Sequence, residues 1–132
     1  MKPVLTEKDF QIIHDLIKNQ SAIQQTKEIR YLADELKKAK VVKEDKIGAD
    51  IVRLNSTVQI EDTANNNVMD FQIVLPSQAN LKEKKISILA PIGIALIGFK
   101  KNQVVEWNMP AGKKTMKIVE VVNAGNLVKE NK

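Results

Sequence analysis

Residues 86–112 decide the fold, and they read ISILAPIGIALIGFKKNQVVEWNMPAG. β-Branched residues favour strands, while glycine and proline interrupt them, so the stretch divides into short elements. Pro91 is expected to end the first strand and turn the chain at a surface, because proline donates no ladder hydrogen bond. The elements predicted in order are a strand beginning with Ile86 and Ile88, a short helix at residues 95–99 closed by Gly98, a strand over Val104, Val105 and Trp107, and a turn at residues 110–113.

The residues on either side of this stretch predict further strands. Apolar and polar residues alternate at 54–60 and at 71–75, which is the period of a half-buried strand. Three consecutive asparagines at 65–67 lie between them, and asparagine tolerates the left-handed backbone of a turn. A last strand is predicted at 116–121, and the tail from Asn123 onward is expected to fray. This part of the chain therefore predicts a mostly antiparallel β unit with one short helix.

The N-terminal part predicts two helices instead. Thr6 is a suitable N-cap, and Asp9 three positions later makes a variant of the capping box. Apolar residues then recur at helical spacing over residues 10–17 and again over 29–36, with a break between the two runs. Two amphipathic helices joined by a short connection predict an antiparallel hairpin. At 1.5 Å per residue the hairpin reaches about 20 Å.

Together the two parts predict an α+β protein. A short antiparallel helical hairpin is expected at residues 1–45, and the β unit at residues 46–132, after a charged linker at 41–50. The length of 132 residues suits one compact domain or a small domain with an appendage. Hydrophobic residues make up 43% of the chain and aromatic residues 4%, so the core has to be built mainly from Ile, Val and Leu.

Composition also limits where the protein acts and what it binds. The chain has no cysteine, no apolar run near the ~18–20 residues of a membrane span, and no signal-peptide pattern, so we expect a soluble cytoplasmic protein. The formal charge of +5 would suit an anionic partner. However, no aromatic residues interleave with the lysines, and arginine occurs only at Arg30 and Arg53. A solvated lysine surface is therefore favoured over direct nucleic-acid binding.

The sequence contains no pattern of catalytic or metal-ligating residues. His14 is the only histidine and is expected on a helix surface, so neither a multi-histidine metal site nor a nucleophilic triad is indicated. Neither glycine-rich phosphate-binding motif is present. The acidic pairs 44–45 and 61–62 are interpreted as solvated turn residues, because neighbours in a strand point to opposite faces. We therefore expect no catalytic residue, no metal and no cofactor, and a binding module instead of an enzyme.

A set of ordered motifs resembles the C-terminal domain of the bacterial transcript-cleavage factors GreA and GreB. The family pattern runs from a strand of the type I-S-x-x-[SA]-P through A-L-[IL]-G to P-x-G. Its matches here are Ile86-Ser87, Ala90-Pro91, Gly93, Ala95-Leu96-Ile97-Gly98, Val104-Val105 and Pro110-Ala111-Gly112, with Ser56-Thr57-Val58 and residues 70–74 upstream. Asn102-Gln103 departs from the Gly-Asp turn of the family. The short hairpin and Trp107-x-x-Pro110 are most similar to the subfamily called regulator of nucleoside diphosphate kinase (Rnk).

This resemblance implies an FKBP-like fold and a role in transcription. In the family, the C-terminal domain seats on RNA polymerase at the rim of its secondary channel. The positions that match this docking segment are Ala90, Pro91, Ile92 and Gly93. The small residues at 90 and 93 are expected to let another backbone approach closely, and Ile92 to offer an apolar contact. The resemblance therefore implies binding to polymerase, with any association with DNA and RNA made indirectly through the transcription complex.

The hairpin differs from that of a cleavage factor at its tip. Cleavage factors carry acidic residues at the tip of a coiled coil to the polymerase active site, where they help to hold Mg²⁺. The tip predicted here contains no carboxylate and comprises Gln20, Ser21, Ala22, Ile23 and Gln24. Amide side chains bind Mg²⁺ far more weakly than carboxylates, and a reach of about 20 Å is short for a deep channel. We therefore predict docking without stimulation of transcript cleavage.

Alternatives from other classes stay open. FKBP-like folds often carry prolyl isomerase activity, but that activity needs a deep aromatic-lined pocket, and at most three aromatic residues lie in the β unit. Another alternative is an adaptor that binds another protein or RNA through the hairpin and the lysine-rich face. We expect a monomer, although Ile23 at the tip would also allow self-association.

Overall fold

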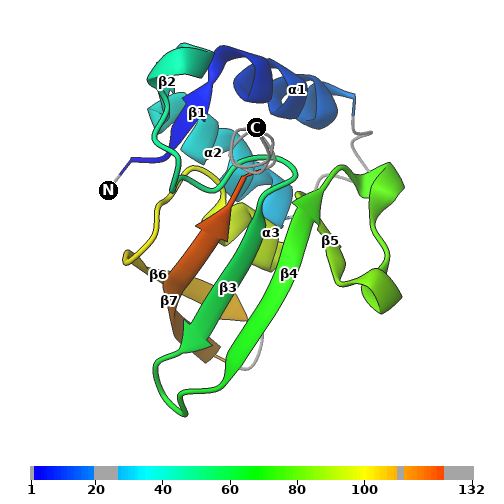
Figure 1. Ribbon diagram of the computed structural model, residues 1–132. Helices are drawn as coiled ribbons and strands as arrows, with labels where there is room; N and C mark the ends of the chain where they lie inside the picture. The colour runs from blue at the N-terminus through cyan, green and yellow to red at the C-terminus, as the bar shows by residue number, and fades with distance from the viewer. Residues whose placement is uncertain (1, 20–26, 110–111, 124–132) are drawn as a thin grey trace.

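The computed structural model describes residues 2–19, 27–109 and 112–123 (Figure 1). The helices are α1 (Glu7–Lys18), α2 (Lys27–Lys38) and α3 (Pro91–Leu96), with 3₁₀ turns η2 (Glu44–Lys46), η3 (Pro76–Gln78) and η4 (Leu81–Glu83). The strands are β1 (Val4–Thr6), β2 (Lys40–Val42), β3 (Thr57–Asp62), β4 (Val68–Val74), β5 (Lys85–Ser87), β6 (Val104–Met109) and β7 (Gly112–Val122). The predicted α+β class is confirmed: a helical hairpin precedes a mainly antiparallel sheet with one short α-helix.

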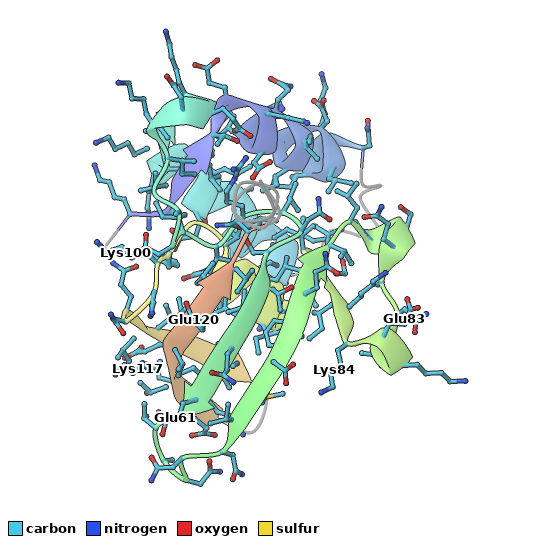
Figure 2. All side chains as sticks on the ribbon, viewed as in Figure 1. Glu61, Glu83, Lys84, Lys100, Lys117 and Glu120 are labelled. Carbon is cyan, nitrogen blue, oxygen red and sulfur yellow. The ribbon has the colours of Figure 1, made fainter. Side chains whose placement is uncertain are left out.

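The large sheet has the strand order β5-β4-β3-β7-β6. Its strands are antiparallel to their neighbours, except that β5 pairs in parallel with β4. Burial alternates along β3, where Val58 and Ile60 are buried, so one face of the sheet lies in the core. Helix α3 lies behind the strands on that face (Figure 1). Figure 2 shows Glu61, Lys117 and Glu120 on the opposite, polar face.

One hydrophobic core joins the helical hairpin to the sheet. Ile13 of α1 and Leu32 of α2 are fully buried in the same cluster as Ile60 of β3 and Leu96 of α3. Burying a side chain of this size contributes about 1.5–3 kcal/mol. The division of the chain near residue 45 stays a prediction, and the core is continuous across it.

Both helices of the hairpin lie where their apolar spacing predicts them. The hydroxyl of Thr6 caps α1 by accepting a hydrogen bond from the N–H of Asp9 at 3.0 Å. Helices α1 and α2 have 12 residues each, and none of the described helices is long and apolar enough to cross a membrane. The chain then returns beside its own start, because β2 pairs in parallel with β1 and places Lys40 opposite Val4. Strands of 3 residues carry too little pattern for the sequence to predict this pair.

The structure corrects the predicted boundaries of the first strand and the short helix in the 86–112 stretch. Strand β5 ends at Ser87, and Pro91 begins α3 instead of ending the strand. Proline suits the first position of a helix, because its missing N–H would have no partner within the helix. The helix therefore covers Pro91–Leu96 instead of residues 95–99.

The structure also corrects the expected fraying at Asn123 itself, while the rest of that tail, residues 124–132, lies outside the described residues. The side-chain amide of Asn123 donates to the carbonyl oxygens of Ala49 at 2.8 Å and of Ile51 at 3.0 Å. Its side-chain oxygen accepts a hydrogen bond from the hydroxyl of Ser56, which itself accepts one from the N–H of Arg53 at 2.7 Å. Asn123 is buried and joins the end of β7 to the segment that enters the sheet.

Candidate functional site

The segment from Ser87 to Gly93 forms a tight corner between β5 and α3. The hydroxyl of Ser87 accepts a hydrogen bond from the N–H of Leu89 at 3.0 Å, and its carbonyl accepts one from the N–H of Ala90 at 3.0 Å. Ala90 is the N-cap of α3 and is half-buried, whereas Pro91, the first helical residue, is exposed. Among residues 90–93, the outer surface of this corner is therefore formed by Ala90 and Pro91.

Ile92 and Gly93 face the interior of the corner. Ile92 is only 5% exposed and belongs to the core. A Cβ atom on Gly93 would lie 2.7 Å from the carbonyl oxygen of Ser87 and 3.2 Å from the Cα of Ile88. The close approach that glycine permits is therefore made by the chain's own backbone. This corrects the expectation that Ile92 offers its side chain, and Gly93 its open space, to a partner.

The predicted tip of the hairpin lies outside the described residues, and it comprises Gln20, Ser21, Ala22, Ile23 and Gln24. On α1, Asp15 is exposed and accepts a hydrogen bond from the amide of Gln11 at 2.9 Å. His14 is exposed beside it, and its ring stacks on that of Phe10 with centroids 6.2 Å apart, as expected of a helix-surface histidine. In the described parts of the chain, no group of three or more His, Cys, Asp and Glu residues is arranged to hold a metal ion.

A charged cluster around Arg53 joins the hairpin to the β unit. The Nη2 of Arg53 donates to both carboxylate oxygens of Glu44, at 2.6 and 2.8 Å, and its Nε donates to Oδ2 of Asp9 at 3.4 Å. Burial raises the pKa of the Asp9 carboxyl group, with Arg53 and the backbone N–H of Leu54 acting in the opposite direction. Burial also disfavours the charge of Arg53, but its hydrogen bond to Glu44 and the charge of Asp9 outweigh this effect and raise the pKa of Arg53.

Sequence reasoning misses this cluster. The sequence marks Asp9 only as part of a helix cap, and no helical or strand period relates it to a residue 44 positions away. One signal was present, because Arg53 is one of only two arginines in the chain. Arginine suits a site with several carboxylates, since its planar guanidinium donates in fixed directions.

Comparison with known proteins assigns this architecture to a family. The family model described as "Transcription elongation factor, GreA/GreB, C-term" matches residues 47–123. The chain belongs to the GreA/GreB family. The GreA/GreB match begins after the helical hairpin and covers β3 to β7, α3 and the corner at 87–93. The family resemblance of the 86–112 motifs is thereby confirmed.

Individual GreA factors are similar to the chain over most of its length. The GreA factor of Azorhizobium caulinodans is 39% identical over 93 residues, which are 70% of this chain and 59% of that protein. The GreA factor of Alkaliphilus oremlandii is 35% identical over 108 residues, which are 82% of this chain and 67% of that protein. The chain thus spans 59% and 67% of the lengths of these two relatives.

Solved structures of the GreA/GreB group extend the similarity to the hairpin. A GreA/GreB transcription elongation factor from Nitrosomonas europaea has a TM-score of 0.77 at 30% identity, and the alignment covers 93% of this chain and 99% of that one. Gfh1 of Thermus aquaticus has a TM-score of 0.52 at 22% identity, which supports the fold alone. The Nitrosomonas alignment covers nearly all of both chains and so includes the hairpin region.

Proposed function

We propose that this protein regulates transcription by binding RNA polymerase at the rim of its secondary channel, without stimulating transcript cleavage. Membership of the GreA/GreB elongation factor family is the observation that carries the proposal. We further propose that the protein acts in the cytoplasm as a monomer, is a binding protein and not an enzyme, and stands closest to the Rnk subfamily. The short hairpin and the Trp107-x-x-Pro110 motif favour that subfamily.

The docking surface in this proposal is the corner formed by Ala90 and Pro91. Its shape is set before binding, because Pro91 has a fixed backbone angle and the backbone beside it is held by two hydrogen bonds to Ser87. A contact that is already ordered loses less conformational entropy when a partner binds. Gly93 and Ile92 support this surface from inside without contacting the partner.

The expected absence of cleavage stimulation rests on the length and the composition of the hairpin. Its 12-residue helices are about 18 Å long at 1.5 Å per residue. The connecting sequence at 19–25, NQSAIQQ, has no carboxylate to hold Mg²⁺ at the polymerase active site. Asp15 is set back along α1, where it is bonded to Gln11.

Binding to purified core RNA polymerase, measured by fluorescence anisotropy at low salt, tests the docking surface. We expect Pro91→Asp to weaken binding at least tenfold, because it puts a charge on the contact surface. Pro76→Asp is the matched control, since Pro76 is also an exposed proline at the start of a helical turn, and it should bind within threefold of the wild type. Absence of wild-type binding, or equal binding by Pro91→Asp, would refute the proposal.

Transcript cleavage in backtracked polymerase complexes tests the second half of the proposal. We expect the rate with saturating protein to equal the rate without it, while a GreA factor added in parallel accelerates cleavage. Displacement of that GreA factor by excess protein should slow its stimulated cleavage. Clear acceleration by the protein alone would contradict the argument from the hairpin.

An adaptor that binds RNA is a second candidate, favoured by where the fold places its lysines. The parallel pairing of β1 with β2 brings the N-terminal strand beside the segment that follows α2. The N–H of Val4 in this strand donates to the carbonyl oxygen of Gly98, two residues before Lys100 (Figure 2). The exposed lysines around this small sheet are Lys2, Lys8, Lys37, Lys38, Lys40, Lys43, Lys46 and Lys100. Within the described residues none of them forms an ion pair.

Charge of this kind would attract an RNA backbone independently of sequence. Titration with a single-stranded RNA at several salt concentrations tests the adaptor candidate. It predicts affinity that falls steeply as salt increases, and a further loss in Lys40→Gln combined with Lys43→Gln. Lys113→Gln, which removes a lysine paired with Glu106 at 3.7 Å, is the control. No binding at low salt would exclude this function.

A further inference from the structure

The first attachment of the hairpin to the β unit is made at Gly98, the glycine of the A-L-I-G motif. The N–H of Val4 donates to the carbonyl oxygen of Gly98 at 2.8 Å, while the N–H of Gly98 donates to the carbonyl oxygen of Val52 at 2.9 Å. A Cβ atom on Gly98 would lie 2.4 Å from the Cβ of Pro3 and 3.0 Å from its Cα. Gly98 therefore leaves the space in which the N-terminal segment lies.

The same segment is connected to the end of the hairpin. The carbonyl oxygen of Pro3 accepts a hydrogen bond from the N–H of Lys40 at 2.9 Å, and only Ala39 separates Lys40 from the end of α2. Strand β1 in turn leads into α1 without a loop (Figure 1). Both helices therefore begin or end within a few residues of the position that Gly98 holds.

The second attachment is the contact of Arg53, which precedes β3, with Asp9 on the first turn of α1. Its guanidinium donates to Asp9 at 3.4 Å and, with two bonds, to Glu44. Asp9 is 5% exposed, and a carboxylate buried to this extent is unfavourable unless it is paired and hydrogen-bonded. Because Arg53 and the N–H of Leu54 both donate to Asp9, α1 is bound to the segment that enters the sheet.

Apolar packing also holds the hairpin, and it would be lost if the hairpin rotated about its attachments at Gly98 and Arg53. Leu5, Ile13, Leu32 and Leu36 are buried in one cluster with Val52 of the β unit. Separation of the hairpin from the sheet would expose these side chains to water.

We infer that Gly98 and Arg53 fix the direction of the helical hairpin relative to the docking corner. Pro91 begins α3, and Gly98 lies two residues after its end. The helix has 6 residues and is about 9 Å long at 1.5 Å per residue. One short rigid element thus separates the docking surface from the root of the hairpin. Arg53 is a positioning residue in this arrangement, because it acts through Asp9 and Glu44.

Spin labels at two introduced cysteines measure the direction of the hairpin, and the absence of native cysteine makes the labelling specific. Lys18→Cys at the end of α1 and Gln59→Cys on the open face of β3 are both at exposed positions. Pulsed electron paramagnetic resonance should give one narrow distance distribution for the parent protein. Arg53→Gln should at least double the width of that distribution.

The control is Lys101→Gln, which removes an ion pair with Glu120 at 3.2 Å within the β unit and should leave the width unchanged. If Arg53→Gln fails to fold, as judged by circular dichroism, the double variant Asp9→Asn with Arg53→Gln replaces it, because it leaves no buried charge unpaired. A distribution as narrow as that of the parent in the folded variant would overturn the inference.

The consequence for function rests on the proposed binding to polymerase and is measured separately. Arg53→Gln should bind core polymerase at least tenfold more weakly than the parent protein although its docking corner is intact, because a hairpin without a fixed direction loses more conformational entropy on binding. It should need at least tenfold more protein to displace a GreA factor, because its hairpin no longer points in one direction. Unchanged displacement would overturn the positioning role, whereas failure of the parent to bind polymerase would overturn the proposed function and leave the distance result standing.

Discussion

Gly98→Ala is the substitution whose effect the structure predicts in most detail. The φ angle of Gly98 is +85°, a left-handed backbone conformation that costs a residue with a Cβ atom about 1–2 kcal/mol. The new methyl group would lie 2.4 Å from the Cβ of Pro3 and 3.0 Å from the N of Val4, so the N-terminal segment has to move. Overpacking of this kind costs about 1–3 kcal/mol.

The sum is a loss of about 2–5 kcal/mol in the free energy of unfolding, out of the ~5–15 kcal/mol that a domain possesses. For a chain of 132 residues, 1 kcal/mol corresponds to about 3–4 °C, so the melting temperature should fall by roughly 6–20 °C. Urea denaturation followed by circular dichroism measures the free energy, and a thermal scan measures the melting temperature.

A double-mutant cycle separates the crowding from the backbone strain. Pro3→Gly removes the Cβ atom that the new methyl group meets, so Gly98→Ala should cost at least 1 kcal/mol less in the Pro3→Gly background. Gly112→Ala is the control, because its φ is +131° and no atom lies within 4 Å of its added Cβ. It should show no coupling to Pro3→Gly. A coupling energy below about 0.5 kcal/mol between positions 3 and 98 would refute the reasoning.

Three further substitutions test other parts of the structure. Lys84 adopts a left-handed conformation with φ of 57° and ψ of 38°, so Lys84→Gly should raise the free energy of unfolding by about 0.5–1 kcal/mol in urea denaturation. A free energy of unfolding below that of the wild type would show that the backbone of Lys84 is not strained. Asn123→Ala removes the donors to the carbonyls of Ala49 and Ile51 and should cost about 2–4 kcal/mol in the same assay, with a loss under 1 kcal/mol counting against the role of this residue. Asp9→Asn tests the raised pKa of Asp9, which lies above the unfolded value of 3.8 in the folded protein, so that ionisation of Asp9 costs stability. The wild type should therefore lose stability relative to Asp9→Asn as the pH rises from below 3.8 through the folded-state pKa. Parallel curves of stability against pH for the two proteins would show that the pKa of Asp9 is not shifted.

Local patterns were sufficient to locate most elements. The hydroxyl of Thr6 caps α1 as the capping pattern predicts, and the apolar spacings of 3.6 and 2 residues place the hairpin helices and the central strands. These patterns depend only on side chains a few positions apart, which is why they can be read without the fold. The family resemblance of residues 86–112 likewise rests on short motifs whose order is preserved.

At the docking corner, local sequence patterns do not predict which side chains reach the surface. The sequence marks residues 90–93 as a unit, yet only Ala90 and Pro91 reach the surface. The start of α3 at Pro91 turns Ile92 and Gly93 inward, toward the core and toward the backbone of Ser87. Whether a small or apolar residue faces a partner or its own protein depends on helix register, and one misplaced helix boundary changes the answer.

The stretch at 86–112, taken by itself, determined the order of strand, helix and strand and the family to which the chain belongs. Only the tertiary structure decided that its Gly98 receives the N-terminal segment and that Arg53 binds Asp9. Residues 3 and 98, or 9 and 53, have no periodic relation along the chain. They meet because the hairpin returns the chain to its own start and a shared core holds it against the sheet, and contacts of that kind exist only in the folded molecule.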